Sequence, residues 1–123
     1  EYMLNENDLL AGVSRQKHPD IIAVADHMMD SHGAGHRKSG ELPEPYGIPY
    51  RCLIPKGFKN LLVAGRIAGF STIAASSCRL SRTMMQLGQA AGTAAAIVNG
   101  DFKQVDTAKL RRKLKVQNVC LDV

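Results

Sequence analysis

Residues 83–100, TMMQLGQAAGTAAAIVNG, limit the choice of fold more than any other part of the chain. Their apolar and small residues recur at intervals of three and four, which predicts a helix that begins at Thr83 and stops at Asn99-Gly100. Gly88 and Gly92 stand four apart on this helix, and each costs about 1 kcal/mol relative to alanine in a helix interior. We therefore expect a neighbouring element to approach the helix backbone closely along the two glycines.

Shorter elements are expected on the N-terminal side. Asn5 and Asn7 are suitable caps for a short helix through residues 8–13, which closes before Pro19. Residues 21–30, IIAVADHMMD, form an apolar stretch that length alone leaves open between strand and helix. Residues 31–47 carry glycines, prolines and charges, which favour a loop.

Two short strands are expected in the middle of the chain. Pro49 and Pro55 bracket residues 50–54, and because proline is confined to strand starts and edges, this segment is predicted to be a strand with marked ends. Residues 61–64 are apolar on both faces, as a buried parallel strand is, and they lead into Gly65 and Arg66. Residues 67–82 are predicted to be a loop with a helical turn.

The net charge of +5 raises the question of an anionic partner. The one dense basic cluster lies on a predicted amphipathic helix that Asp106 caps, and it lacks the interleaved aromatic residues that stack bases. We expect a solvated helix face and no nucleic-acid partner; the alternative is a non-catalytic interaction module that binds acidic partners through this helix. The cluster consists of Lys109, Arg111, Arg112, Lys113 and Lys115.

Cysteine content and hydropathy indicate the redox state of the thiols and whether the chain enters a membrane. Cys52, Cys78 and Cys120 form no CxxC pair, so reduced structural thiols are expected. No apolar run approaches the roughly 20 residues of a membrane span, so no membrane partner is expected. A cytoplasmic location is the default expectation. Because the chain opens on Glu1, the alternative that a targeting segment preceded it stays open.

Several polar motifs are weak candidates for chemistry. GAGHRK, residues 33–38, lacks the third glycine and the following helix of a dinucleotide-binding turn. No G-x-S-x-G elbow is present, so nucleophilic catalysis is not supported. The one concentration of possible metal ligands is expected to be a polar chain reversal without metal, or else to place Asp30 and His32 at the edge of a substrate pocket. Its members are Asp26, His27, Asp30, His32 and His36.

Three arginines flank the start of the glycine-alanine helix, at positions 66, 79 and 82. A helix N-terminus offers unpaired N–H groups and a partial positive charge, so arginines nearby favour an anionic ligand there. The alternative is that Arg66, Arg79 and Arg82 only solvate a loop.

Two runs carry a family resemblance: IPYRCLIPKGFKNLLVAGR and AASSCRLSRTMMQLGQAAGTAAAIV. Together they resemble the C-terminal part of FAD-dependent oxidoreductases of the glutathione-reductase-like flavoprotein class, and more narrowly a bacterial FAD-dependent oxidoreductase group. The similarity covers roughly residues 20–115. Such an enzyme transfers hydride or electrons between a substrate and FAD.

The resemblance implies the C-terminal part of a two-domain FAD-binding fold, α/β overall and α+β in the isolated chain. Residues 1–57 would form the end of the substrate domain and the segment that returns from it to the FAD-binding domain. Residues 58–123 would complete the FAD-binding domain. The N-terminal FAD-binding portion of the same protein would be the partner. We expect the chain alone to be inactive, to hold no FAD and to self-associate, because the pyrophosphate site and the cover of its apolar faces would be missing.

The resemblance also implies site residues. Ala64, Gly65 and Arg66 would reach the cofactor from a strand end, while the backbone at the helix start would face the flavin. That start comprises Thr83, Met84 and Met85.

The substrate and the catalytic residues stay unknown, with Arg51, Arg79 and His32 as candidates to face the substrate. Members often carry histidine where Thr72 stands and proline where Arg82 stands, so the loss or change of an acid, a base or a substrate contact stays open.

Overall fold

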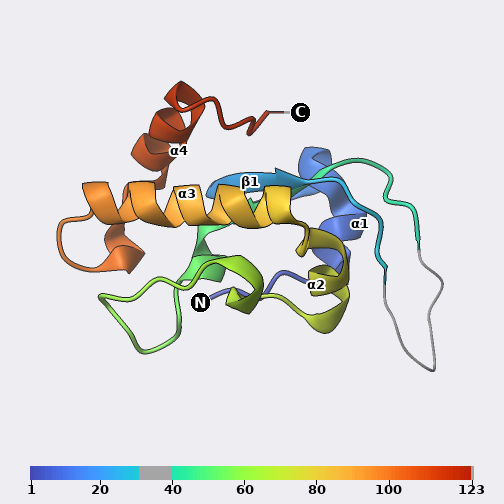
Figure 1. Cartoon of the computed structure of the whole chain (residues 1–123), viewed down its shortest axis with the longest axis horizontal. Coiled ribbons are helices and arrows are strands. Elements are labelled where there is room, and N and C mark those ends of the chain that lie inside the picture. Colours follow the sequence, from blue (N-terminus) through green and yellow to red (C-terminus); the bar gives the residue numbers. More distant parts are fainter. Residues whose placement is uncertain (31–39, 123) are drawn as a thin grey trace.

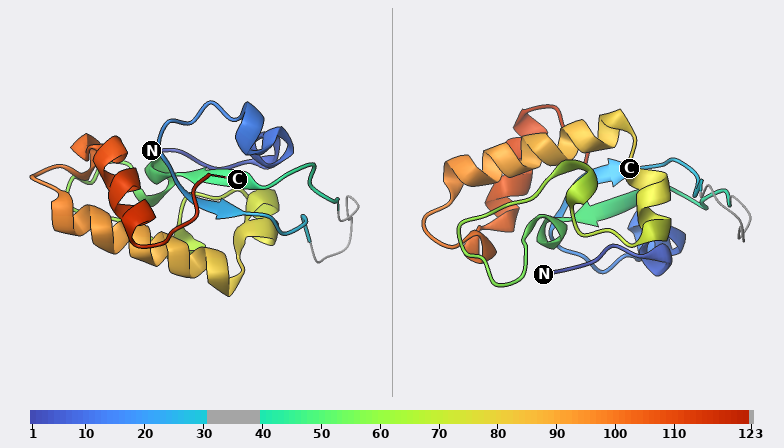
Figure 2. Two further views of the ribbon diagram at one scale, coloured as in Figure 1. Left: turned by 90° about the horizontal axis from the view of Figure 1, so that it is seen from above. Right: turned by 60° about the horizontal axis from the view of Figure 1, so that its bottom comes forward.

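A two-stranded antiparallel sheet lies between helices, with α1 on one side and α3 on the other (Figures 1 and 2). The computed structural model describes residues 1–30 and 40–122. The mixed α and β composition expected from the sequence is confirmed. With η for 3-10 helices, the elements are α1 (Glu6–Arg15), β1 (Ile21–Ala25), β2 (Tyr46–Pro49), η1 (Tyr50–Leu53), η2 (Gly65–Ile67), α2 (Thr72–Cys78), α3 (Ser81–Ile97), η3 (Phe102–Gln104) and α4 (Thr107–Val116).

The sheet is short and mostly buried. Ala23 lies opposite Ile48 and Val24 opposite Gly47, with an irregularity between Ile21 and Ala23. Gly47 is required there, because a Cβ at this position would meet the Ile21 side chain at 2.4 Å. The open edge of β1 is covered by a side chain, since the Val24 amide donates to Oε1 of Gln86 on α3 at 3.1 Å.

The helices bury their apolar stripes against this sheet and against one another. Leu9 of α1 and Leu87 of α3 are fully buried, and so are Leu110 and Leu114 of α4. Arg111 fastens α4 to the sheet because its Nη1 donates to the Ile21 carbonyl at 2.6 Å. The structure also confirms the predicted helix that Asp106 caps, because the Asp106 side chain accepts from the Lys109 amide at the start of α4.

The predicted N-terminal helix is confirmed and slightly longer than expected. Asn5 and Asp8 form a reciprocal capping box at the start of α1. Gly12 interrupts the helix with a φ of +65°, and a Cβ there would meet the Glu44 side chain at 2.1 Å. Glycine therefore sets the bend in α1.

The expected strand over residues 50–54 is wrong. The strand β2 instead ends at Pro49, which lacks an N–H to continue the ladder, and residues 50–53 form η1. In this turn the Tyr50 amide donates to the Asp20 carbonyl at 2.7 Å, and the Arg51 amide donates to Asp20 Oδ2 at 3.2 Å. Satisfying both amides on one aspartate favours the turn over an extended chain.

The second expected strand, residues 61–64, is also wrong. The Val63 amide donates to the Leu53 carbonyl at 2.8 Å, but among residues 1–30 and 40–122 no segment forms a ladder with it. Leu61 is 42% exposed, so the segment is not buried on both faces. Gly65 and Arg66 consequently lie on the short turn η2 and not on a strand end.

The glycine-alanine helix is confirmed as α3, which starts at Ser81 and ends at Ile97. Gly88 and Gly92 lie on its exposed face, and a Cβ at either would meet nothing within 4 Å in the part of the chain that the structure describes. The expected close neighbour is therefore not an element of this sheet. Residues 72–78 are a full helix, α2, where a loop with one helical turn was expected.

The remaining sequence-based expectations concern the loop after β1, the domain division and membrane-spanning helices. GAGHRK, His32 and His36 lie outside the described residues. The loop expected over residues 31–47 ends earlier, because β2 begins at Tyr46. The division at residues 57 and 58 stays a prediction. None of the helices in the described ranges has the length and apolarity to cross a bilayer.

Candidate functional site

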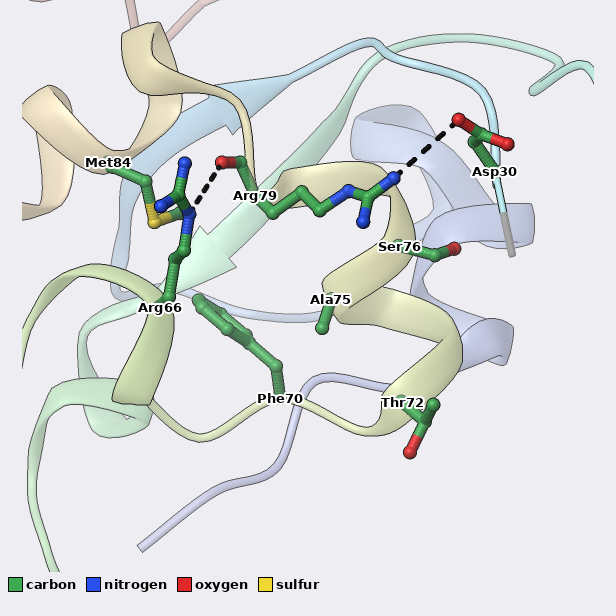
Figure 3. A pocket seen from close by; sticks show the side chains of 8 residues that line it. All are labelled: Asp30, Arg66, Phe70, Thr72, Ala75, Ser76, Arg79 and Met84. Atoms are coloured by element: carbon green, nitrogen blue, oxygen red, sulfur yellow. Dashed lines mark hydrogen bonds and ion pairs between the residues drawn. The ribbon is translucent and has the colours of Figure 1, made fainter. Parts of the chain in front are cut away.

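A cavity of about 480 Å³ opens where η2, α2 and the first turn of α3 meet (Figure 3). Two guanidinium groups, one carboxylate, two hydroxyls and three apolar side chains line it. The lining residues are Asp30, Arg66, Phe70, Thr72, Ala75, Ser76, Arg79 and Met84.

The floor of the cavity is set by the segment that leads into α2. The Leu4 amide donates to the Gly69 carbonyl at 2.9 Å, and the Gly69 amide donates to the Cys52 carbonyl at 2.8 Å. A Cβ on Gly69 would lie 2.2 Å from the Tyr2 carbonyl, so glycine alone permits this approach. Ser71 then caps α2 by accepting from the Ala74 amide.

The far end of α2 is anchored to the sheet and to the chain after β1. The Tyr46 hydroxyl contacts Ser77 Oγ at 2.7 Å, and Ser77 in turn donates to the His27 carbonyl. Ser77 and Cys78 are fully buried. This anchoring fixes the point from which Arg79 enters the cavity.

Arg66 and Arg79 occupy different parts of the cavity. Arg79 extends along α2, away from Arg66, and its Nη2 lies 3.6 Å from Asp30 Oδ2 (Figure 3). Arg66 rises beside Met84, and its Nε donates to the Arg79 carbonyl at 3.4 Å. Two of the arginines that the sequence singled out therefore line one cavity.

A second hollow, of about 510 Å³, adjoins the cavity at the N-terminus of α3. Arg66 and Met84 line both. No side chain caps this end of α3, since Leu80 stands at the N-cap. The residues that line the hollow are Gly65, Arg66, Ser81, Met84 and Met85.

The earlier start of α3 changes which amides are open. The Met84 amide already donates to the Leu80 carbonyl at 3.0 Å. The open N–H groups of the first turn are therefore those of Ser81, Arg82 and Thr83, and the predicted contact of the Met84 and Met85 backbone with a cofactor stays a prediction. Met84 and Met85 both line the hollow.

Two predicted cofactor residues line neither space with a side chain. Ala64 is half-buried and extended, and it precedes the turn of η2. Thr83 is buried, with 1% of its surface exposed, so its side chain belongs to the packing of α3.

Arg51 lies apart from the cavity in a network of its own. Its Nε donates to Asp20 Oδ2 at 3.0 Å, and its Nη2 lies 3.0 Å from His18 Nδ1. His18 Nε2 lies 2.8 Å from Asp8, which also accepts from the Tyr2 hydroxyl at 2.9 Å. The structure thus places Arg51 in a cluster that joins the N-terminal segment, α1 and η1.

Burial and the Asp8 hydrogen bond raise the pKa of Tyr2 to about 12. Burial likewise raises the pKa of Cys52 and of Cys78 to about 12. Both thiols are therefore poor nucleophiles near neutral pH.

Sequence reasoning missed Phe70 and Ser76 as lining residues. Both stand in a small, hydroxyl-rich run without a periodic signal, and only the packing of α2 brings them to the cavity. The alternative that put Asp30 at a pocket edge agrees with its position, while His32 lies outside the described residues. In the described ranges, no group of three or more histidine, cysteine, aspartate or glutamate side chains could hold a metal ion.

The basic helix α4 divides its cations between two tasks. Arg111 binds the Ile21 carbonyl, and Lys115 Nζ lies 2.5 Å from Asp122. The remaining cations line a surface groove with Val116. The alternative of an interaction module for acidic partners stays a prediction. The groove cations are Lys109, Arg112 and Lys113.

The chain belongs to the FAD dependent oxidoreductase family, whose model matches residues 1–114. The complete protein therefore uses FAD as its cofactor. No curated protein and no solved structure matches the chain.

The described residues fit one part of FAD. Open amides at the N-terminus of α3 and the Arg66 guanidinium suit a ring edge that gains negative charge, and the Met84 and Met85 side chains suit an apolar ring. No strand, glycine turn and helix of the kind that cradles a pyrophosphate occurs over residues 1–30 and 40–122.

Proposed function

We propose that this chain is the C-terminal portion of an FAD-dependent oxidoreductase of the glutathione-reductase-like class and forms one wall of its active site. The observation that supports this most strongly is the pair of adjoining spaces at the start of α3. The hollow contains four of the predicted cofactor residues, the cavity contains the substrate candidate Arg79, and both share Arg66 and Met84.

Bound FAD would supply the chemistry, by accepting or donating two electrons. The part of this chain is to hold and tune the flavin. Arg66 and the open amides of residues 81–83 would stabilise negative charge at the flavin edge, and a helix N-terminus contributes about 0.3–1 kcal/mol to such an anion. Met84 and Met85 would exclude water from the ring.

The cavity would hold the substrate beside the flavin. Thr72 lines it, where the family pattern often has histidine, and a threonine hydroxyl neither gains nor loses a proton near neutral pH. Asp30 is the one carboxylate among the described lining residues. An acid or base for the reaction would therefore be Asp30 or a group outside the described ranges.

The reduction potential of the bound flavin tests this proposal. Replacing Arg66→Gln in the complete protein removes a positive charge beside the flavin and is expected to lower the two-electron potential. A loss of about 1.4 kcal/mol corresponds to roughly 30 mV. Spectroelectrochemical titration measures the shift.

Arg112→Gln is the matched control, because it removes the same charge from the groove on α4. Its potential should stay at the wild-type value. Equal potentials for wild type, Arg66→Gln and Arg112→Gln would contradict the placement of the flavin beside η2.

The 123-residue chain alone is expected to retain no FAD, because its described residues offer no pyrophosphate cradle. Gel filtration after incubation with excess FAD tests this. A flavin spectrum that co-elutes with the chain at a 1:1 ratio would overturn the expectation.

A further inference from the structure

The charges that line the cavity do not cancel. Arg66 and Arg79 contribute two positive charges and Asp30 one negative charge, which leaves 2 − 1 = 1 positive charge among the described lining residues. Arg79 faces Asp30 at 3.6 Å and is thereby balanced. No ion pair of Arg66 with a described residue is found, so the excess charge lies there.

The guanidinium of Arg66 is already oriented. Its Nε donates to the Arg79 carbonyl at 3.4 Å, which orients the group beside Met84 and leaves its two terminal amino groups available to a ligand. Such a planar fork matches the two oxygens of a carboxylate. A single excess charge matches a carboxylate better than a doubly charged phosphate.

The remaining wall is suited to an apolar body. Phe70, Ala75 and Met84 present carbon and sulfur to the cavity, and Thr72 and Ser76 add hydroxyls at its α2 side. A volume of about 480 Å³ lies within the range of small-molecule sites, roughly 300–1,000 Å³.

We propose that this cavity binds a small organic monocarboxylate with an apolar or aromatic body, whose carboxylate pairs with Arg66 and whose body lies against Phe70 and Met84. That this ligand is the substrate rests on the function proposed above. The binding itself does not.

Benzoate is a suitable probe, with benzamide as its uncharged counterpart and inorganic phosphate as a compact anion. Isothermal titration of the complete protein is expected to show benzoate binding at least about tenfold more tightly than benzamide or phosphate. Arg66→Gln should weaken benzoate binding by about tenfold, whereas Arg112→Gln should leave it unchanged.

Asp30→Asn provides a change of opposite sign. The substitution removes the negative charge that lines the cavity, and Asp30 does not line the adjoining hollow. Benzoate should therefore bind several-fold more tightly. A merely structural role of Asp30 would not strengthen binding. Thermal unfolding of each variant, with Arg66→Lys as a charge-retaining form, confirms that the proteins are folded.

Equal affinities for benzoate and benzamide, stronger binding of phosphate, or no effect of Arg66→Gln in a folded protein would each overturn the proposal. The FAD content of the same samples tests the proposed function separately. A protein without bound FAD that still binds benzoate through Arg66 would show that the carboxylate site does not depend on the flavin site proposed above.

Discussion

Asp20 is a buried hydrogen-bond acceptor that the sequence did not single out. It is 4% exposed and accepts from the Arg51 amide and guanidinium, while its carbonyl accepts from Tyr50. Arg51, predicted to face substrate, is held in this network. A charged side chain thus connects the chain before β1 to η1.

Replacing Asp20→Ala is expected to destabilise the protein by about 2–3 kcal/mol, because hydrogen bonds to a buried charged group are lost and Arg51 keeps its charge. Urea unfolding measures the change in the free energy of unfolding. Asp26→Ala is the control, since Asp26 pairs with Arg82 on the exposed surface and should contribute less than about 1 kcal/mol. Equal losses in the two variants would argue against the Asp20 network.

Among single residues, the sequence indicated Arg66, Arg79 and Met84, and the structure brings all three to one cavity. It did not indicate Phe70 or Ser76, which have no periodic or motif signal. Their positions depend on hydrogen bonds between segments distant in the chain, such as Leu4 to Gly69.

At the scale of elements, local patterns predicted the helices better than the strands. Caps and periodicity lie within a few residues, so Asn5, Asp106 and the glycine-alanine stretch were sufficient for α1, α4 and α3. A strand depends on a partner elsewhere. Residues 61–64 have the composition of a strand, but no ladder forms along them in the described ranges.

The glycines of α3 make a second prediction. Gly88→Ala should stabilise the chain by up to about 1 kcal/mol, because alanine is the better helix former and the position is open. Gly12→Ala should destabilise it by at least about 1 kcal/mol, because φ is +65° and the Cβ would meet Glu44. Chemical unfolding of both variants measures the difference.

A stabilised chain that no longer assembles with the proposed N-terminal FAD-binding portion would locate the close neighbour of α3 on that portion. Loss of stability on Gly88→Ala would instead show that α3 is already covered within the chain.

For the whole molecule, buried acidic protons predict a loss of stability at alkaline pH. The pKa of Cys52 and of Cys78 rises from an ordinary value near 9 to about 12, and burial also raises the pKa of Tyr2, Tyr46 and Tyr50. The folded state therefore holds these protons more tightly than the unfolded state. Stability is fully present below pH 9 and falls as the pH rises toward 12.

At about 1.4 kcal/mol per unit of pKa and per group, the two thiols alone give a loss of roughly 2–3 kcal/mol between pH 8 and pH 10. Urea titrations at the two pH values measure this. Replacing Cys52→Ala should reduce the pH dependence, whereas Cys120→Ala, at an exposed position, should not. An unchanged slope in Cys52→Ala would contradict the assignment.

The isolated chain is predicted to self-associate because large apolar side chains are exposed on its surface. Ile67 of η2 and Met85 of α3 are 76% and 73% exposed, and Met85 lines the hollow proposed to hold the flavin. Light scattering should show species larger than a monomer, and Met85→Lys should reduce them. Val116→Lys is the control, because Val116 is 84% exposed on α4. A monomer at high concentration would refute the prediction.

The sequence by itself determined α1, α3 and α4, the caps of α1 and α4, the family and the arginines that line the cavity, because those signals are local or lie in contiguous motifs. Only the tertiary structure decided that residues 50–53 turn, that Arg51 is bound by Asp20, and that Arg66 and Arg79 line one cavity with Asp30. Each of these depends on hydrogen bonds or packing between segments far apart in the chain. Composition and spacing do not encode such contacts individually; the folded chain selects them together.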